Sequence, residues 1–148
     1  MVRPTPSTRA DYSAFSTHTT RWVDNDIYGH MNNVVHYQLF DTAVNSYLLE
    51  QGVLDLKSGK TVFLVVETGC QYFSELAFPD VITSGINLRK LGTSSVTYEV
   101  GLFRGVSNIA AAHGHFVHVH VDLKTRRPLE INLEIKEVLR NLLTNSVI

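Results

Sequence analysis

The sequence predicts an α+β fold in which an antiparallel sheet wraps around one long central helix. Two observations lead to this fold class. One long segment has helical periodicity and is apolar around most of its circumference, so other elements must enclose it. Four strand-like segments then follow one another with short connections, which favours antiparallel pairing in a single sheet. We expect one domain over residues 1–148, with residues 1–14 as a flexible N-terminal arm.

The first half of the chain is predicted to contain a strand, the long helix and a second strand. Phe15 to Val23 is rich in threonine and aromatic residues, as strands are. The helix is expected from about Asn33 to Glu50, and Gly52 is well placed to end it. Its narrow polar face consists of Gln38, Asp41, Thr42 and Asn45. Thr61 to Phe73 is so continuously apolar and β-branched that we expect burial on both sides over part of its length.

The second half is predicted to contain three more strands and a short amphipathic helix. The strands are expected at Val81 to Leu91, at about Val96 to Leu102, where apolar and polar residues alternate, and at about Ile109 to Asp122. Asn132 can cap the final helix. The apolar stripe of this helix consists of Ile135, Val138, Leu139, Leu142 and Leu143.

Composition and charge exclude several classes of protein. The formal net charge is −1, whereas a nucleic-acid-binding domain would carry a basic excess. No segment approaches the roughly twenty consecutive apolar residues of a membrane helix. The polar N-terminal segment also lacks the apolar core of a secretion signal. The single cysteine, Cys70, fits a reducing compartment, so we expect a cytoplasmic protein in which this thiol is buried and structural.

The segment from Asp24 to Asn33 gathers carboxylate, glycine, histidine and amide side chains immediately before the long helix. A helix N-terminus offers unpaired backbone N–H groups and the positive end of the helix dipole. A carbonyl oxygen that gains negative charge there would be stabilised. The arrangement therefore suits acyl transfer.

The same residues resemble the hotdog-fold acyl-CoA thioesterases of the 4-hydroxybenzoyl-CoA thioesterase type. The resemblance rests on Arg21 to Asn33, followed by Tyr37 and the long helix, with the pattern Asp, any residue, Asp, two residues, Gly-His-Met-Asn-Asn. The element order agrees from Phe15 to Pro128. The resemblance implies a hotdog fold and hydrolysis of an acyl-CoA thioester to a free acid and coenzyme A, without a cofactor. It also implies a homodimer or homotetramer with the active site at a subunit boundary.

The resemblance assigns roles to individual residues of the motif. Asp26 falls at the position of the catalytic carboxylate, where it would act as nucleophile or as the base that activates water. The backbone N–H of Asn33 would polarise the thioester carbonyl, and Val34 would add its N–H to the same site. His30 would orient the thioester or Asp26, although a structural hydrogen bond is equally compatible with its place beside a turn. The residues expected to line the substrate site are Gly29 and Tyr28.

Three further polar residues have alternative interpretations. Asp24 shares a face of the extended chain with Asp26, so it can raise the pKa of Asp26 by like-charge repulsion, but we expect it to be a turn or capping residue. Asn32 is expected to cap the helix or hold the loop. Glu67 interrupts an apolar run and needs a partner there, which makes it the second candidate base.

The phosphates of coenzyme A must be met by local basic groups, because the net charge of the chain is close to zero. Arg89 and Lys90 lead into a turn with Ser94 and Ser95, and Arg126 follows the last predicted strand. Guanidinium, ammonium and hydroxyl groups at turns suit phosphate. The alternative is that these residues form two solvated turns.

Two rival functions remain open at this stage. A strand with His113, His115, His118 and His120 suggests metal binding, but alternation places the first two on one face and the last two on the other. We therefore expect no metal site. A non-catalytic module that binds acyl-CoA or acyl carrier protein would have no use for a carboxylate at Asp26. Neither the acyl group nor its carrier follows from the sequence.

Overall fold

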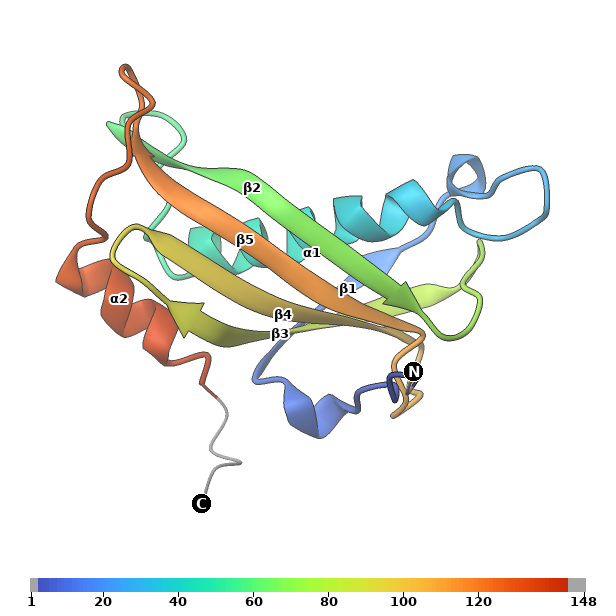
Figure 1. Cartoon of the computed structure of the whole chain (residues 1–148). Helices are drawn as coiled ribbons and strands as arrows, with labels where there is room; N and C mark the ends of the chain where they lie inside the picture. Colours follow the sequence, from blue (N-terminus) through green and yellow to red (C-terminus); the bar gives the residue numbers. More distant parts are fainter. Residues whose placement is uncertain (1–2, 144–148) are drawn as a thin grey trace.

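The computed structural model describes residues 3–143, which form one five-stranded antiparallel sheet and two helices (Figure 1). The strands lie in the order β1-β3-β4-β5-β2. The element bounds are β1 Ala14–Thr19, α1 Asn33–Glu50, β2 Thr61–Tyr72, β3 Val81–Leu91, β4 Ser95–Arg104, β5 Ala112–Asp122 and α2 Leu133–Arg140, with single 3-10 turns η1 Arg9–Asp11 and η2 Trp22–Asp24. The predicted α+β class, antiparallel sheet, long helix and short C-terminal helix are confirmed.

The main core lies between α1 and the face of the sheet that it crosses, which we call the helix face (Figure 1). Phe40, Val44 and Leu48 follow one another at intervals of four residues, so they lie on one side of α1, and all three are fully buried. Burying each such side chain contributes roughly 1.5–3 kcal/mol. The sheet covers only this side, because Val34 and Leu49 on α1 are 55% and 46% exposed. Within one protomer, the helix is therefore less enclosed than we expected.

The first strand ends at Thr19, whereas we expected it to continue to Val23. Its end is set by a short-range interaction. Asp24 accepts a hydrogen bond from the backbone N–H of Arg21 at 2.8 Å and forms an ion pair with the Arg21 guanidinium at 2.8 Å. These contacts close the 3-10 turn η2, so Trp22 is turned outward and is 79% exposed.

Strand β2 lies at one edge of the sheet, and the prediction of burial on both of its faces is wrong. None of its residues is fully buried, and Val65 and Val66 are 46% and 59% exposed. A β-bulge between Val65 and Glu67 breaks the register with β5. The apolar run therefore belongs to an edge strand whose second edge has no partner strand in the described part of the chain.

The N-terminal arm, which we expected to be flexible, packs across the opposite face of the sheet, which we call the outer face. Its anchor is Tyr12, which is 7% exposed and meets Phe103 edge-to-face at 5.8 Å. The ring lies so close to β4 that a β-carbon at Gly101 would be 2.6 Å from it. A bridge between Thr8 and Ile109 extends this contact.

The C-terminal helix α2 begins and packs as its sequence predicts. The Asn132 side chain accepts a hydrogen bond from the Ile135 N–H at 2.9 Å, which caps the helix. Ile135, Leu139 and Leu142 are buried, whereas Leu143 at the end of the stripe is 52% exposed. In residues 3–143, neither helix is long and apolar enough to cross a membrane.

Candidate active site

The loop between β1 and α1 folds the predicted motif into a compact turn. The Asp26 N–H donates to the His30 carbonyl at 2.8 Å, and Asn25 and Met31 form an isolated bridge on either side. Gly29 closes the turn with φ +81°, a conformation that strongly favours glycine. The Met31 N–H then donates to the Leu76 carbonyl at 2.7 Å, which fastens this loop to the segment between β2 and β3.

The carboxylate of Asp26 is held by the backbone of its own turn. Its Oδ1 accepts hydrogen bonds from the N–H groups of Tyr28 at 2.9 Å and His30 at 3.4 Å. The other oxygen, Oδ2, has no hydrogen-bond partner among residues 3–143. The geometry thus fixes one oxygen and leaves the second available to a ligand or water.

The first two N–H groups of α1 differ in their hydrogen bonding. Asn32 is the N-cap, as we expected, and its side chain accepts from the Val34 N–H at 3.1 Å. The Asn33 N–H has no partner in the described part of the chain. The Tyr72 hydroxyl donates to the Asn33 carbonyl at 3.1 Å and so anchors the first residue of the helix to β2. Of the two predicted carbonyl-polarising groups, the Asn33 N–H is the one left unpaired.

A pocket of about 260 Å³ opens at this end of α1, and we call it the helix-start pocket. Its lining combines the motif with the end of β2 and the segment that follows: His30, Met31, Asn33, His36, Tyr72, Phe73, Ser74, Glu75 and Leu76. Inside it, the His30 Nε2 atom lies 2.9 Å from the Glu75 carboxylate. The structure therefore brings together His30 and Asn33, while Asp26 lies on the adjoining turn.

Sequence reasoning identified His30 and Asn33 but none of the other seven residues of this pocket, of which His36, Tyr72 and Glu75 have titratable side chains. His36 lies three residues after Asn33 on the helix, so its spacing alone indicated the same face. The other two come from the end of β2 and the following loop, and their placement depends on strand register. The His36 ring is 4% exposed and meets the Tyr72 ring edge-to-face at 4.7 Å. Burial lowers the pKa of His36, which keeps its ring neutral.

Two other motif residues differ in their surroundings. Asp24 is buried and engaged with Arg21, in agreement with a turn residue. Tyr28 points away from the protomer and is 76% exposed.

Comparison with known proteins identifies the family. The sequence profile of the thioesterase-like superfamily matches residues 20–140. The chain belongs to the thioesterase-like superfamily. This membership makes the protein an acyl-CoA thioesterase by class. No curated protein matches the chain.

Solved structures agree with the family and the fold. The PA5185 protein from Pseudomonas aeruginosa strain PAO1 is 46% identical with a TM-score of 0.91, over 95% of this chain and 98% of that chain. The 1,4-dihydroxy-2-naphthoyl-CoA thioesterase from Synechocystis is 15% identical with a TM-score of 0.76, over 85% of this chain and 94% of that one. The DHNA-CoA thioesterase from Staphylococcus aureus is 14% identical with a TM-score of 0.76, over 86% and 87%. The last two show that the fold is shared.

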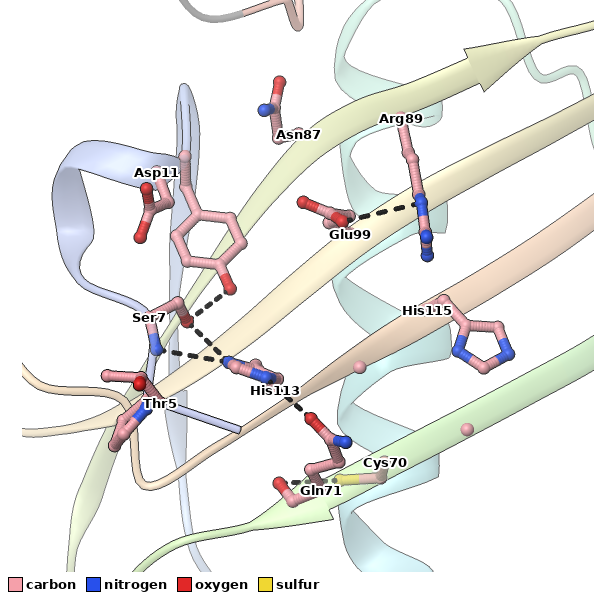
Figure 2. A pocket seen from close by; sticks show the side chains of 14 residues that line it. Thr5, Ser7, Asp11, Cys70, Gln71, Asn87, Arg89, Glu99, His113 and His115 are labelled. Atoms are coloured by element: carbon pink, nitrogen blue, oxygen red, sulfur yellow. Dashed lines mark hydrogen bonds and ion pairs between the residues drawn. The ribbon is translucent and has the colours of Figure 1, made fainter. Parts of the chain in front are cut away.

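The thioesterase also has a larger hollow of about 650 Å³ on its outer face, beneath the N-terminal arm (Figure 2). Its polar side chains bind one another. His113 accepts from the Ser7 N–H at 3.2 Å through Nδ1 and lies 3.0 Å from Gln71 through Nε2. Arg89 points towards Glu99 at 3.7 Å. Burial raises the pKa of the Cys70 thiol to about 11, so this cysteine is a poor nucleophile.

The second candidate base, Glu67, lies away from the helix-start pocket. Its carboxylate is 3.1 Å from the Nε2 atom of His115, which lines the outer-face hollow. The four histidines of β5 divide as alternation predicts, because His118 and His120 are buried on the helix face. Within residues 3–143, no three His, Cys, Asp or Glu side chains are grouped so that they could hold a metal ion.

Within one protomer, the predicted phosphate-binding residues lie far from the helix-start pocket. Arg89 lines the outer-face hollow. Ser95 pairs with Val119, whereas Tyr72 of the helix-start pocket pairs with Ala112. These β5 positions are seven residues apart, or about 23 Å at the usual strand rise. Within one protomer, the β3–β4 turn and the turn that follows β5 lie at the opposite end of the sheet from the start of α1 (Figure 1).

Proposed function

We propose that this protein hydrolyses an acyl-CoA thioester at the start of α1, with Asp26 as nucleophile or general base. The observation that carries the proposal is the unpaired Asn33 N–H at the helix N-terminus, on the wall of a pocket and next to the turn that holds Asp26. A thioester oxygen that accepts this N–H would also lie at the positive end of the helix dipole. No cofactor is required for this reaction.

Both chemical routes use the free Oδ2 of Asp26. In the general-base route, Asp26 takes a proton from water while the water oxygen bonds to the thioester carbon. The tetrahedral intermediate then loses the sulfur as coenzyme A thiolate, which takes up a proton. In the nucleophilic route, Oδ2 attacks the carbon and displaces the thiolate, and water then cleaves the resulting anhydride. In both routes, the Asn33 N–H stabilises the negative oxygen.

His30 is proposed to position the substrate or Asp26. Its Nε2 atom is engaged with Glu75, so the ring is held on the wall of the pocket. The backbone of the same residue supports Asp26 through an N–H and a carbonyl. Gly29 and Tyr28 belong to the same turn and are proposed as its substrate-facing residues.

We further propose a homodimer that pairs two copies of β2. The free edge of β2 exposes Val65 and Val66, which a second copy would cover. A two-fold axis makes identical edge strands antiparallel, so the Thr61 end of one β2 would lie beside the Tyr72 end of the other. Thr61 pairs with Asp122, and the Arg126 turn follows directly.

In such a dimer, Arg126, Ser94 and Ser95 of one protomer would approach the helix-start pocket of its partner. These residues, with Lys90, are therefore proposed to bind the phosphates of coenzyme A. Larger homo-oligomers built from this dimer are compatible with the same site. Within one protomer these residues lie about 23 Å from the helix-start pocket. In the proposed dimer, the partner protomer would supply them instead.

The test is turnover of an acyl-CoA panel of varied chain length and ring content, followed by thiol release. Asp26→Asn should lower kcat roughly 10²–10⁴-fold, because it removes the base or nucleophile. Asp41→Asn is the matched control, since Asp41 is exposed on α1 and contacts only Asn45 through its side chain. Loss of turnover in Glu67→Gln with full turnover in Asp26→Asn would transfer the role to Glu67. Tight binding of acyl-CoA without hydrolysis would instead indicate a binding module.

A further inference from the structure

The inner wall of the helix-start pocket contains a buried histidine without a hydrogen-bond partner. His36 is 4% exposed, and its Nδ1 atom is buried without a hydrogen-bond partner among residues 3–143. Unpaired polar groups at this depth are rare in folded proteins, because leaving one unsatisfied is costly. A ligand that supplies the missing partner would remove that cost.

We propose that His36 is a specificity-determining residue that accepts a hydrogen bond from a hydroxyl group on the acyl chain of the substrate. This inference rests on the proposed function, because it takes the thioester carbonyl to lie at the Asn33 N–H. It adds the class of acyl group: a hydroxyacyl group, aliphatic or aromatic, with its hydroxyl near the carbonyl.

The position of His36 on α1 sets where that hydroxyl would lie. Residues three apart on a helix are neighbours, with β-carbons about 5–6 Å apart. Helical side chains also lean towards the N-terminus, so the His36 ring covers the turn that contains Asn33. An acyl group bound through its carbonyl at Asn33 would therefore pass the ring within its first few carbon atoms.

A neutral His36 ring has a nitrogen lone pair, which requires a hydrogen-bond donor on the ligand. Burial lowers its pKa, so the ring is neutral, with one N–H and one nitrogen lone pair. The backbone of Asn32 and Asn33 opposes this shift without reversing it. When the ring N–H is on Nε2, the unpaired Nδ1 is an acceptor, and it suits a hydroxyl better than a keto group.

Much of the wall around His36 is apolar or already engaged. Met31 and Leu76 are almost fully buried and apolar, the Tyr72 ring meets His36 edge-to-face, and the Tyr72 hydroxyl is bound to the Asn33 carbonyl. The nearest ionisable pair in the pocket, His30 and Glu75, is already engaged at 2.9 Å. An acyl group without a hydroxyl would consequently leave the His36 nitrogen unpaired.

The experiment compares matched substrates: butanoyl-CoA with 3-hydroxybutanoyl-CoA, and benzoyl-CoA with its three monohydroxylated isomers. In the wild type, kcat/KM should be roughly ten- to a hundredfold higher for the hydroxylated member of at least one pair. His36→Phe keeps the aromatic shape, so the ratio of kcat/KM between the hydroxylated and parent members of the pair should fall to about one. His36→Gln restores an acceptor and should recover part of the preference.

Tyr47→Phe is the control on the same helix, because it removes a hydroxyl bound to the Val138 carbonyl and lies outside the pocket. Binding of the same pairs by calorimetry gives a second readout that does not depend on turnover or on a fully active variant. Equal preference in wild type and His36→Phe, or no preference in any pair, would overturn the role of His36. Absence of hydrolysis throughout the panel, with a His36-dependent binding preference, would overturn the proposed function alone.

Discussion

The two hollows of this thioesterase differ in how many of their polar groups already have partners. The outer-face hollow is the larger, at about 650 Å³, but His113, Gln71 and Arg89 bind neighbouring side chains or backbone there. The helix-start pocket is about 260 Å³, and its wall includes Asn33, whose N–H has no partner in residues 3–143, and His36, whose buried Nδ1 atom has none either. Polar groups without a partner in the protein are what a ligand can complete. The smaller hollow is therefore the better candidate for chemistry.

The largest expected effect comes from removing the Asn33 N–H itself. Asn33→Pro deletes this donor together with the Asn33 side chain and should keep the helix, because proline is favoured at the first position of a helix and Asn32 already has the extended backbone (φ −55°, ψ 135°) that precedes proline. We expect kcat to fall roughly 10²–10³-fold while the melting temperature is unchanged. Asn33→Ala keeps the N–H and should retain most of the activity. Full activity of Asn33→Pro would show that the carbonyl binds elsewhere.

Acidification should act on the helix face more than on the outer face. Burial lowers the pKa of His118 to about 4, compared with 6.5 for an unperturbed histidine. Between these values the unfolded state binds more protons than the folded state, so stability is lost as the pH falls from 6.5 to 4, by about 3 kcal/mol. Urea unfolding across this range should give a shallower pH dependence for His118→Phe. His113→Gln on the outer face should flatten the curve less, because burial also lowers the pKa of His113 but this ring is less buried than that of His118. Identical curves for wild type and His118→Phe would contradict the assignment.

A smaller effect is expected when the anchor of the helix start is removed. Tyr72→Phe deletes the hydroxyl that donates to the Asn33 carbonyl at 3.1 Å. One such bond is worth about 1 kcal/mol, so kcat should fall about fivefold with little change in KM. Steady-state kinetics with Tyr47→Phe as the reference would show whether the loss is specific. A change confined to KM would mean that Tyr72 contacts substrate instead.

The smallest effect is expected in the outer-face hollow. Glu99→Gln removes a partly exposed ion pair with Arg89 whose nitrogen and oxygen are 3.7 Å apart. Such pairs contribute about 0–1 kcal/mol, so the free energy of unfolding and kcat should both stay close to wild type. A large drop in kcat would reverse the ranking of the two hollows.

The sequence predicted those features that depend on near neighbours along the chain. The bounds of α1, the caps at Asn32 and Asn132, and the division of the β5 histidines between two faces all follow from local periodicity and capping chemistry. The end of β1 was misjudged because the Asp24 interaction with Arg21 overrides the strand propensity of Trp22 and Val23.

Features that depend on distant neighbours were not predicted. The edge position of β2 follows from strand order, and periodicity alone does not distinguish an apolar edge strand from a buried one. Tyr72 and Glu75 reach the helix-start pocket only because β2 ends there. Similarly, Arg89 and Lys90 near the end of β3 and Arg126 after β5 were identified as basic clusters, but their distance from the pocket depends on the sheet.

The bulge in β2 also bears on how this protein avoids aggregation while it folds. Residues 61–66, TVFLVV, are uncharged and rich in β-branched residues, which is the composition of segments that stack into cross-β fibres. Lys60 precedes the run and Glu67 ends it, so a charge stands on each side. The bulge falls between Val65 and Glu67 and twists the edge there, so a flat foreign strand would match it over only part of its length. The bulge that shifts the register between β2 and β5 therefore also limits which strands can pair with the free edge of β2.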